Sequence, residues 1–236
     1  MVTETPLVLP SLRSRRGRRF EAIHELELEP DALEAAASLP GAHRGVVVVR
    51  EMAGPFGVPD LVAVVGSPAG LAQRVALPVP PLLNQIDAGV VAASAPRAAR
   101  SAQTLARRVG FPLHSVERRL PELTRVGALM RTGPTGYVRP QALQSVGRLY
   151  AIETKVKDWR RALRQARTYG LWCDSYILVM ASLGSGSLAT VIDAVVRDGA
   201  GLVVAGQWVQ RPRLGERSPA QRLWGSEHLV AAMRGE

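Results

Sequence analysis

Two valine-rich runs near residue 50 predict β-strands. The segments GVVVVREM (45–52) and PDLVAVVG (59–66) are bounded by glycine and proline, and their apolar positions follow one another without regular alternation. Such continuous runs are typical of strands that are buried on both faces. We therefore expect a sheet that is covered on both sides.

The segment RLYAIETKVK (148–157) has a different pattern, because charged and apolar positions alternate along it. A strand with this period of two places Ile152 and Val156 on one face. Its other face then carries Glu153, Lys155 and Lys157. This strand is predicted to be amphipathic.

A helix should follow the amphipathic strand. Asp158 is suited to be its N-cap, apolar residues recur at helical spacing, and Gly170 is suited to end it. Two further buried strands are expected at SYILVMA (175–181) and AGLVVAG (200–206). They should be separated by a turn at GSGS (184–187) and by a helix.

The middle of the chain has another character. From Pro78 to Pro140 the pattern predicts three helices followed by a hairpin rich in glycine and proline, and a short helix is expected near 226–234. Strands and helices therefore occur in mixed order along the chain. The predicted fold class is α/β.

The charge of the chain indicates a polyanionic partner. The formal net charge is +10, and of the 30 basic residues only Lys155 and Lys157 are lysine, which leaves 28 arginines. Clustered arginine attracts phosphate and releases counterions when it binds. General solubility is the alternative explanation of the same charge.

Other side chains limit the possible metal chemistry. The single cysteine, Cys173, excludes an intramolecular disulfide and a site of several thiolates, and the four histidines lack metal-binding spacing. Carboxylates remain as ligands, and these suit a hard cation such as Mg²⁺. No signal peptide or membrane-spanning segment is recognisable, so we expect a soluble, cytoplasmic protein without a membrane partner.

Asp60, Glu153 and Lys155 could form one chemical site. Asp60 precedes an apolar strand, where a carboxylate is costly unless a cation or a donor satisfies it. Two carboxylates at neighbouring strand ends could hold Mg²⁺, and a lysine beside them could position or deprotonate an attacking water. A compact ammonium that can lose its proton is a reason to use lysine here in an arginine-rich chain.

Three motifs resemble those of the PD-(D/E)xK nuclease superfamily, and particularly of its RecB-like branch. GVPD (57–60), ETK (153–155) and QARTY (165–169) correspond to G-x-x-D, E-x-K and Q-x-x-x-Y. The predicted order of strand, strand, E-x-K strand, helix and strand is also similar to the restriction-endonuclease-like core of that superfamily. The resemblance therefore implies an α/β fold with such a core.

The resemblance also implies a set of site residues and a metal, Mg²⁺ or Mn²⁺. Asp60, Glu153 and the Thr154 carbonyl would bind the metal. Lys155 would act on the attacking water, and Gln165 and Tyr169 would line the site. Glu21 would match a helical acidic position of the superfamily.

Each motif has a simpler interpretation as well. Asp60 can be a turn residue after Pro59, and the E-x-K motif can be an exposed strand face with charged side chains. Gln165 and Tyr169, four residues apart, can be an ordinary surface pair on a helix. The order of the three motifs on suitable elements favours the nuclease interpretation.

The 92 residues between Asp60 and Glu153 require an inserted domain. The segments 101–110 and 115–129, followed by MRTGPTGYVRP (130–140), resemble the helix-turn-helix and wing of a winged-helix domain. Pro121 should kink the recognition helix or mark its start. The alternative is a helical insertion that serves dimerisation or packing.

Several arginines are candidates for contact with double-stranded DNA. The resemblance to a winged helix implies that one helix face contacts a major groove of DNA and that the hairpin contacts phosphates. These two surfaces carry Arg118, Arg119, Arg125, Arg131 and Arg139, and the helix after the E-x-K strand adds Arg160, Arg161, Arg164 and Arg167. A solvated surface is the alternative for the last group.

The sequence thus predicts a nuclease core made of residues 1–77 and 148–236, with a winged-helix domain inserted at 78–147. The predicted function is metal-dependent endonuclease cleavage of duplex DNA, by a homodimer if both strands are cut. A DNA-binding regulator that retains the fold without cleaving is the alternative, because a fold does not establish an activity. RNA or a protein partner is a third possibility.

Overall fold

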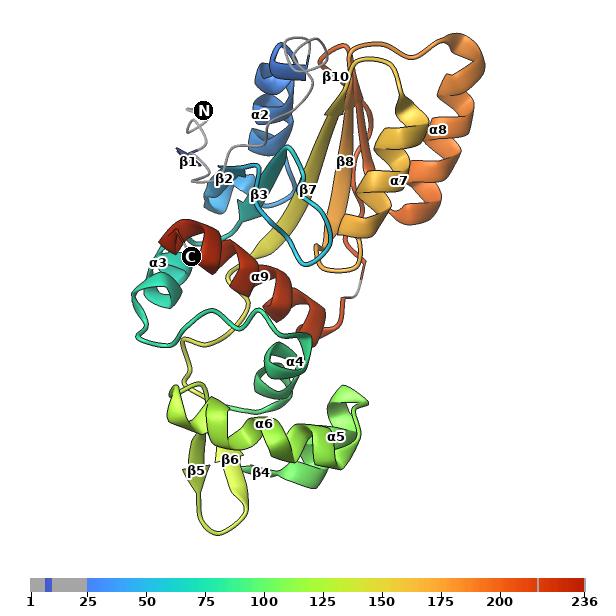
Figure 1. The fold of residues 1–236 in the computed structure, drawn as a ribbon. Helices are drawn as coiled ribbons and strands as arrows, with labels where there is room; N and C mark the ends of the chain where they lie inside the picture. Colours follow the sequence, from blue (N-terminus) through green and yellow to red (C-terminus); the bar gives the residue numbers. More distant parts are fainter. Residues whose placement is uncertain (1–6, 10–24, 216, 236) are drawn as a thin grey trace.

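The computed structural model of the 236-residue chain describes residues 7–9, 25–215 and 217–235. A large sheet with helices on both faces occupies one end of the molecule, and a small sheet with three helices occupies the other (Figure 1). The long C-terminal helix α9 (Pro219–Arg234) lies between them. The mixed α/β fold class is therefore confirmed.

Within the described residues, the large sheet contains seven strands in the order β1-β2-β3-β7-β8-β9-β10. β2 and β3 are antiparallel, β3 and β7 are antiparallel, and β7, β8 and β9 are parallel. The strands are β1 (Leu7–Leu9), β2 (Val46–Arg50), β3 (Leu61–Val65), β7 (Arg148–Lys155), β8 (Ser175–Met180), β9 (Gly201–Val204) and β10 (Gln207–Gln210). Residues far apart in sequence thus become neighbours at β3 and β7.

Both faces of the large sheet are buried, as the valine-rich runs predict. Helix α2 (Glu29–Ala37) covers one face with Ala32, Ala35 and Ala36, which pack against side chains such as Val48 and Ile152. Helices α7 (Trp159–Tyr169) and α8 (Ser185–Asp198) cover the other face. β3 is buried at every position for this reason.

The small sheet has the order β4-β6-β5 and packs with three helices. Its strands are β4 (Arg100–Ser101), β5 (Met130–Thr132) and β6 (Gly136–Val138). The helices are α4 (Gln85–Ala93), α5 (Ala102–Val109) and α6 (Leu113–Arg125), so three helices and a hairpin form where the sequence predicts them. Val116, Leu120 and Leu123 of α6 are buried in the core of this region.

Helix α9 belongs to both cores. Leu223 and Trp224 near its start pack into the core around the small sheet, while Leu229 packs into the core of the large sheet. The core at 78–147 is therefore completed by residues from the C-terminal end of the chain. This helix connects the two regions. The predicted short helix at 226–234 would not do so, because it lacks Leu223 and Trp224.

Local predictions differ from the structure at several points, and one of them is that β7 is not amphipathic, because side chains on both of its faces are buried by helices. β7 ends at Lys155, so Lys157 lies beyond the strand, and α8 begins at Ser185, inside the predicted turn 184–187. Helix α6 runs from Leu113 to Arg125, so Pro121 lies inside the helix and does not mark its start. Helix α9 begins at Pro219, where Ser218 caps it and proline has no N–H to leave unsatisfied.

Candidate active site at the ends of two antiparallel strands

The register of β3 and β7 brings Asp60 to Glu153. Leu61 lies opposite Ile152, so the next step along both strands places the two acidic residues side by side. Asp60 is fixed by two hydrogen bonds to its Oδ2, from the Thr154 backbone nitrogen at 2.7 Å and from the Thr154 hydroxyl at 2.8 Å. The carboxylate that the sequence places before an apolar strand is thus satisfied by the neighbouring strand.

The loop before Asp60 packs closely on α7. Gly57 has a φ of +78°, and a Cβ at this position would lie 3.0 Å from the Tyr169 ring. The Tyr169 hydroxyl is 3.3 Å from the carbonyl of Val58, which belongs to the same loop. The glycine of the G-x-x-D motif is therefore required by a left-handed backbone and by contact with an aromatic ring.

Glu153 is almost completely buried, with 2% of its surface exposed. The Tyr169 hydroxyl donates a hydrogen bond of 2.9 Å to its Oε2, and Lys155 Nζ lies 3.3 Å from Oε1. Burial and the nearby Asp60 charge raise the pKa of Glu153 to about 7, although Lys155 and Tyr169 act in the opposite direction. The protein therefore does not fully offset the free-energy cost of ionising Glu153 at this buried position.

Lys155 lies among three acceptors. Its Nζ is 2.6 Å from Glu25 Oε1, 3.1 Å from the Thr154 carbonyl and 3.3 Å from Glu153 Oε1. Burial disfavours the ammonium, but Glu153, Glu25 and Asp60 outweigh it and raise the pKa of Lys155. Lys155 is therefore a positive charge at neutral pH. In the metal-free protein the ammonium is therefore the favoured form, because the neighbours of Lys155 are carboxylates and not cations.

The two α7 residues of the Q-x-x-x-Y motif have different contacts. Tyr169 is buried and binds Glu153, which the interpretation as a surface pair does not explain. Gln165 lies one turn earlier, and its side-chain oxygen is buried without a hydrogen-bond partner in the described part of the chain. The structure thus brings Tyr169 to the acidic pair, and it gives Gln165 no hydrogen bond to Asp60, Glu153 or Lys155. Asp158 caps α7 through the Arg161 nitrogen, as predicted.

Glu25 is a site residue that the sequence prediction missed. Its carboxylate lies 2.6 Å from Lys155 Nζ, although the two residues are 130 positions apart in the sequence. Glu21, the predicted acidic position, lies outside the described residues. A search for acidic residues one helical turn after Glu21 would have found Glu25, since positions four apart share a helix face.

The predicted metal ligands offer oxygen atoms of the kind that Mg²⁺ prefers. Asp60 and Glu153 are adjacent carboxylates, and the charge of Asp60 raises the pKa of Glu153. A divalent cation between them would relieve this repulsion, so the residues fit a hard cation. The Thr154 carbonyl, the third predicted ligand, accepts a hydrogen bond from Lys155. Within the described residues, no group of three or more histidine, cysteine, aspartate and glutamate side chains is arranged for a metal.

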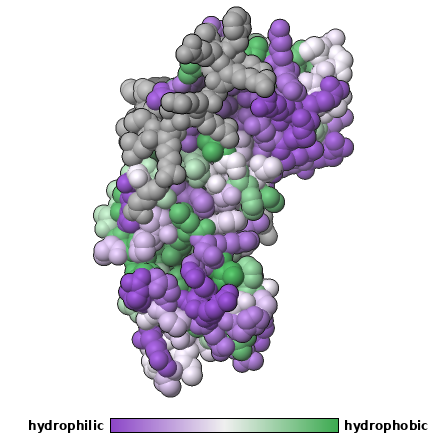
Figure 2. All heavy atoms as spheres, viewed as in Figure 1, coloured by the Kyte–Doolittle hydropathy of each residue, from purple (hydrophilic) through white to green (hydrophobic). Residues whose placement is uncertain are grey.

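The candidate DNA-binding arginines fall into two groups. Arg118, Arg131, Arg160, Arg161 and Arg164 are exposed, and of these Arg131 also donates a hydrogen bond to the Pro134 carbonyl within its own hairpin. Those on α7 belong to a side of the molecule that hydrophilic residues cover over α7 and α8 (Figure 2). These side chains are accessible to a large polyanion.

Four other arginines are held by protein groups. Arg119 forms two hydrogen bonds to Asp87 of α4, and Arg125 forms two to Glu122. Arg139 donates to the carbonyls of Leu143 and Pro140, and Arg167 pairs with Asp198. Arg119 and Arg139 therefore stabilise the region around the small sheet. The helical periodicity of the sequence could not predict this role, because it does not show which groups of other elements lie nearby.

Glu153→Gln should stabilise the metal-free protein at pH 8. The folded pKa of about 7 lies above the ordinary value of 4.5 for a glutamate, so the wild type loses stability as pH rises from about 4.5 to 7. The loss is up to about 3 kcal/mol in the free energy of unfolding. Glutamine cannot ionise and keeps an acceptor for Tyr169. Urea unfolding in EDTA should therefore give E153Q the higher stability at pH 8 and nearly equal stabilities at pH 4.5. A constant difference between these pH values would contradict the raised pKa.

Comparison of the chain with protein-family models, with curated proteins and with solved structures finds no match. Among the helices of the described residues, none has the length and apolar character needed to span a membrane.

Proposed function

We propose that this chain is a metal-dependent endonuclease that hydrolyses phosphodiester bonds of duplex DNA. One observation carries the proposal: Asp60, Glu153 and Lys155 converge at the ends of two strands, although 92 residues separate the first two. A buried carboxylate with a raised pKa beside a second carboxylate is costly for folding. Such an arrangement is typical of functional sites.

The proposed core is restriction-endonuclease-like. Four consecutive strands of the large sheet, β2, β3, β7 and β8, and helix α7 after the E-x-K strand support this interpretation. The proposed inserted domain at 78–147 is a winged helix, which is supported by three helices followed by a short hairpin at the small sheet.

In the proposed reaction, Asp60 and Glu153 would hold Mg²⁺ or Mn²⁺ with the Thr154 carbonyl. The bound ion would polarise the phosphate and lower the pKa of the attacking water. Thr154 orients Asp60, and Tyr169 orients Glu153. The Lys155 ammonium would offset negative charge that develops on the phosphate, a role that its raised pKa suits.

Duplex DNA is the proposed substrate because of the net charge and the exposed arginines. Arg118 on α6 and Arg131 in the hairpin would contact DNA from the inserted domain, and Arg160, Arg161 and Arg164 would contact it beside the active site. Cleavage of both strands would require two active sites, so a homodimer is proposed for that case.

The proposal is tested by incubating the purified protein with supercoiled and linear DNA in Mg²⁺ or Mn²⁺. We expect the wild type to nick or linearise the DNA and EDTA to prevent this. Asp60→Asn should bind DNA without cleaving it, because asparagine keeps an acceptor for Thr154 and loses the charge. The matched control is Asp193→Asn on the α8 helix, which should cleave normally.

Two outcomes would contradict this proposal in different ways. Intact DNA under all metal conditions, together with a gel shift, would favour the non-cleaving DNA-binding regulator. Absence of duplex binding at low salt would favour RNA or a protein as the partner, because contacts to DNA phosphates are strongest at low salt.

A further inference from the structure

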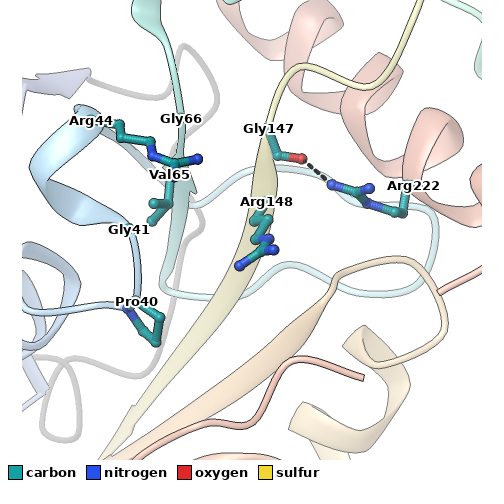
Figure 3. A pocket seen from close by; sticks show the side chains of 8 residues that line it. All are labelled: Pro40, Gly41, Arg44, Val65, Gly66, Gly147, Arg148 and Arg222. Atoms are coloured by element: carbon teal, nitrogen blue, oxygen red, sulfur yellow. Dashed lines mark hydrogen bonds between the residues drawn. The ribbon is translucent and has the colours of Figure 1, made fainter. Parts of the chain in front are cut away.

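A pocket lined by three arginines lies at the opposite end of β3 and β7 from Asp60 and Glu153. Its volume is about 220 Å³, and its lining consists of Pro40, Gly41, Arg44, Val65, Gly66, Gly147, Arg148 and Arg222. None of these lining residues is acidic. In Figure 3, Arg44 and Arg222 enter from opposite sides and Arg148 lies on the strand between them.

The three arginines come from segments that are distant in sequence. Arg44 ends the short helix η1 (Ala42–Arg44), Arg148 begins β7, and Arg222 belongs to α9. Glycine brings the backbone close together between them: Gly147 has a φ of +142°, and a Cβ there would lie 2.8 Å from the Val65 carbonyl oxygen. A side chain at this position would force the two strands apart.

Carboxylates of the described residues neutralise only one of the three charges. Arg222 Nε lies 3.0 Å from Asp174 Oδ1, and its Nη2 donates to the Gly147 carbonyl at 2.9 Å. Arg148 lies near the hydroxyl of Tyr150, which is uncharged at neutral pH and whose pKa burial raises to about 12. The Arg44 side chain has neither an ion pair nor a hydrogen bond to a described residue. Two positive charges therefore face one pocket without a matching negative charge from the described residues.

The size and chemistry of the pocket indicate a small anion. Its volume is below the roughly 300–1,000 Å³ of pockets for drug-sized ligands. Guanidinium groups offer paired N–H donors that match the oxygens of a phosphate. We propose that this pocket binds a phosphate group, either as the free anion or as part of a nucleotide or of DNA.

The pocket is separate from the proposed active site. Gly66 is six residues from Asp60, which corresponds to about 20 Å along a strand. Arg148 also points to the face of β7 opposite to Glu153, since the two positions differ by five and side chains alternate along a strand. A ligand that binds here would connect η1, β7 and α9 at the place where the chain leaves the large sheet after β3 and returns to it at β7.

Inorganic phosphate is the probe for this site. The wild type is titrated with phosphate in EDTA, with ionic strength held constant by NaCl, and thermal unfolding and calorimetry are recorded. We expect a saturable rise of Tm and a measurable heat of binding. Arg44→Gln and Arg148→Gln should each lower the phosphate affinity at least about tenfold, because each removes a charge-assisted bond. Arg213→Gln, an exposed arginine elsewhere, should bind phosphate as the wild type does.

Two results would overturn the proposal: no phosphate effect beyond that of NaCl, or equal binding by the wild type and both pocket variants. The Tm of each variant without phosphate shows whether it has folded. Because EDTA prevents metal-dependent cleavage, failure here is independent of whether the chain is a nuclease.

Measurements of DNA binding by the same variants identify the source of the phosphate. A duplex without terminal phosphates should bind less tightly to both pocket variants, but not to the Arg213→Gln control, if the DNA backbone occupies the pocket. If the natural ligand is a mononucleotide or free phosphate, the pocket variants should bind the duplex as tightly as the wild type does. They should still show the tenfold loss of affinity in the phosphate titration. Either pattern supports a phosphate site.

Discussion

Lys155→Arg should lower the rate of DNA cleavage at least about a hundredfold and leave duplex affinity within about twofold, because displacing a charge that stabilises the transition state has effects of this order. The Lys155 ammonium has three N–H donors, and three acceptors from Glu25, Glu153 and Thr154 surround it. Its side chain is only 13% exposed, so little room is left for a larger group. A planar guanidinium cannot reproduce this compact arrangement without moving Glu153.

The matched control is Lys157→Arg. Lys157 is exposed and lies after the end of β7, so its replacement by arginine should change neither cleavage nor binding. The measurements are single-turnover cleavage with saturating protein in Mg²⁺, and fluorescence anisotropy with labelled duplex in EDTA. A Lys155→Arg protein with wild-type cleavage would remove the main argument for a specific role of this lysine.

Arg74→Met should destabilise the folded protein by about 3–5 kcal/mol, because it leaves a buried carboxylate without its partner. Arg74 and Glu227 both have side chains with 0% exposure and are joined by bonds of 2.9 and 2.5 Å. Arg74 also donates to the carbonyls of Val79 and Pro80, and Glu227 accepts from the Leu82 nitrogen. This network holds helix α3 (Pro68–Ala76) and the segment 79–82 against α9.

Thermal and urea unfolding would measure this effect, and we expect a fall in Tm on the order of 10 °C for a chain of this size. The double variant Arg74→Met/Glu227→Leu should recover part of the loss, since it removes the isolated charge as well. Arg125→Met is the surface control, because Arg125 and Glu122 form an exposed pair on α6, and its Tm should stay close to that of the wild type. A single Arg74→Met variant with unchanged Tm would show that the buried pair does not stabilise the fold.

Helix α6 shows what the local sequence pattern predicts correctly and what depends on tertiary contacts. Helical periodicity correctly buries Val116, Leu120 and Leu123, because apolar burial depends mainly on the repeat of the helix. It also assigns Arg119 to the DNA-facing side, whereas Asp87 of another helix binds this side chain. Periodicity describes one helix at a time and contains no information about the charges on its neighbours.

The E-x-K strand and its motif are determined by the sequence itself, although the strand is buried on both faces and is not amphipathic. Alternation places Glu153 and Lys155 on one strand face, the valine-rich runs require a sheet buried on both sides, and Asp158 caps the next helix, since each of these depends on local periodicity or hydrogen bonding. Only the tertiary structure decided which groups meet. The register of β3 and β7 brings Asp60 to Glu153, and the path of the chain before α2 brings Glu25 to Lys155. Carboxylates surround that ammonium as a result, so contacts with Glu25 and Asp60, together with Glu153 on the same strand, raise the pKa of Lys155 in spite of its burial.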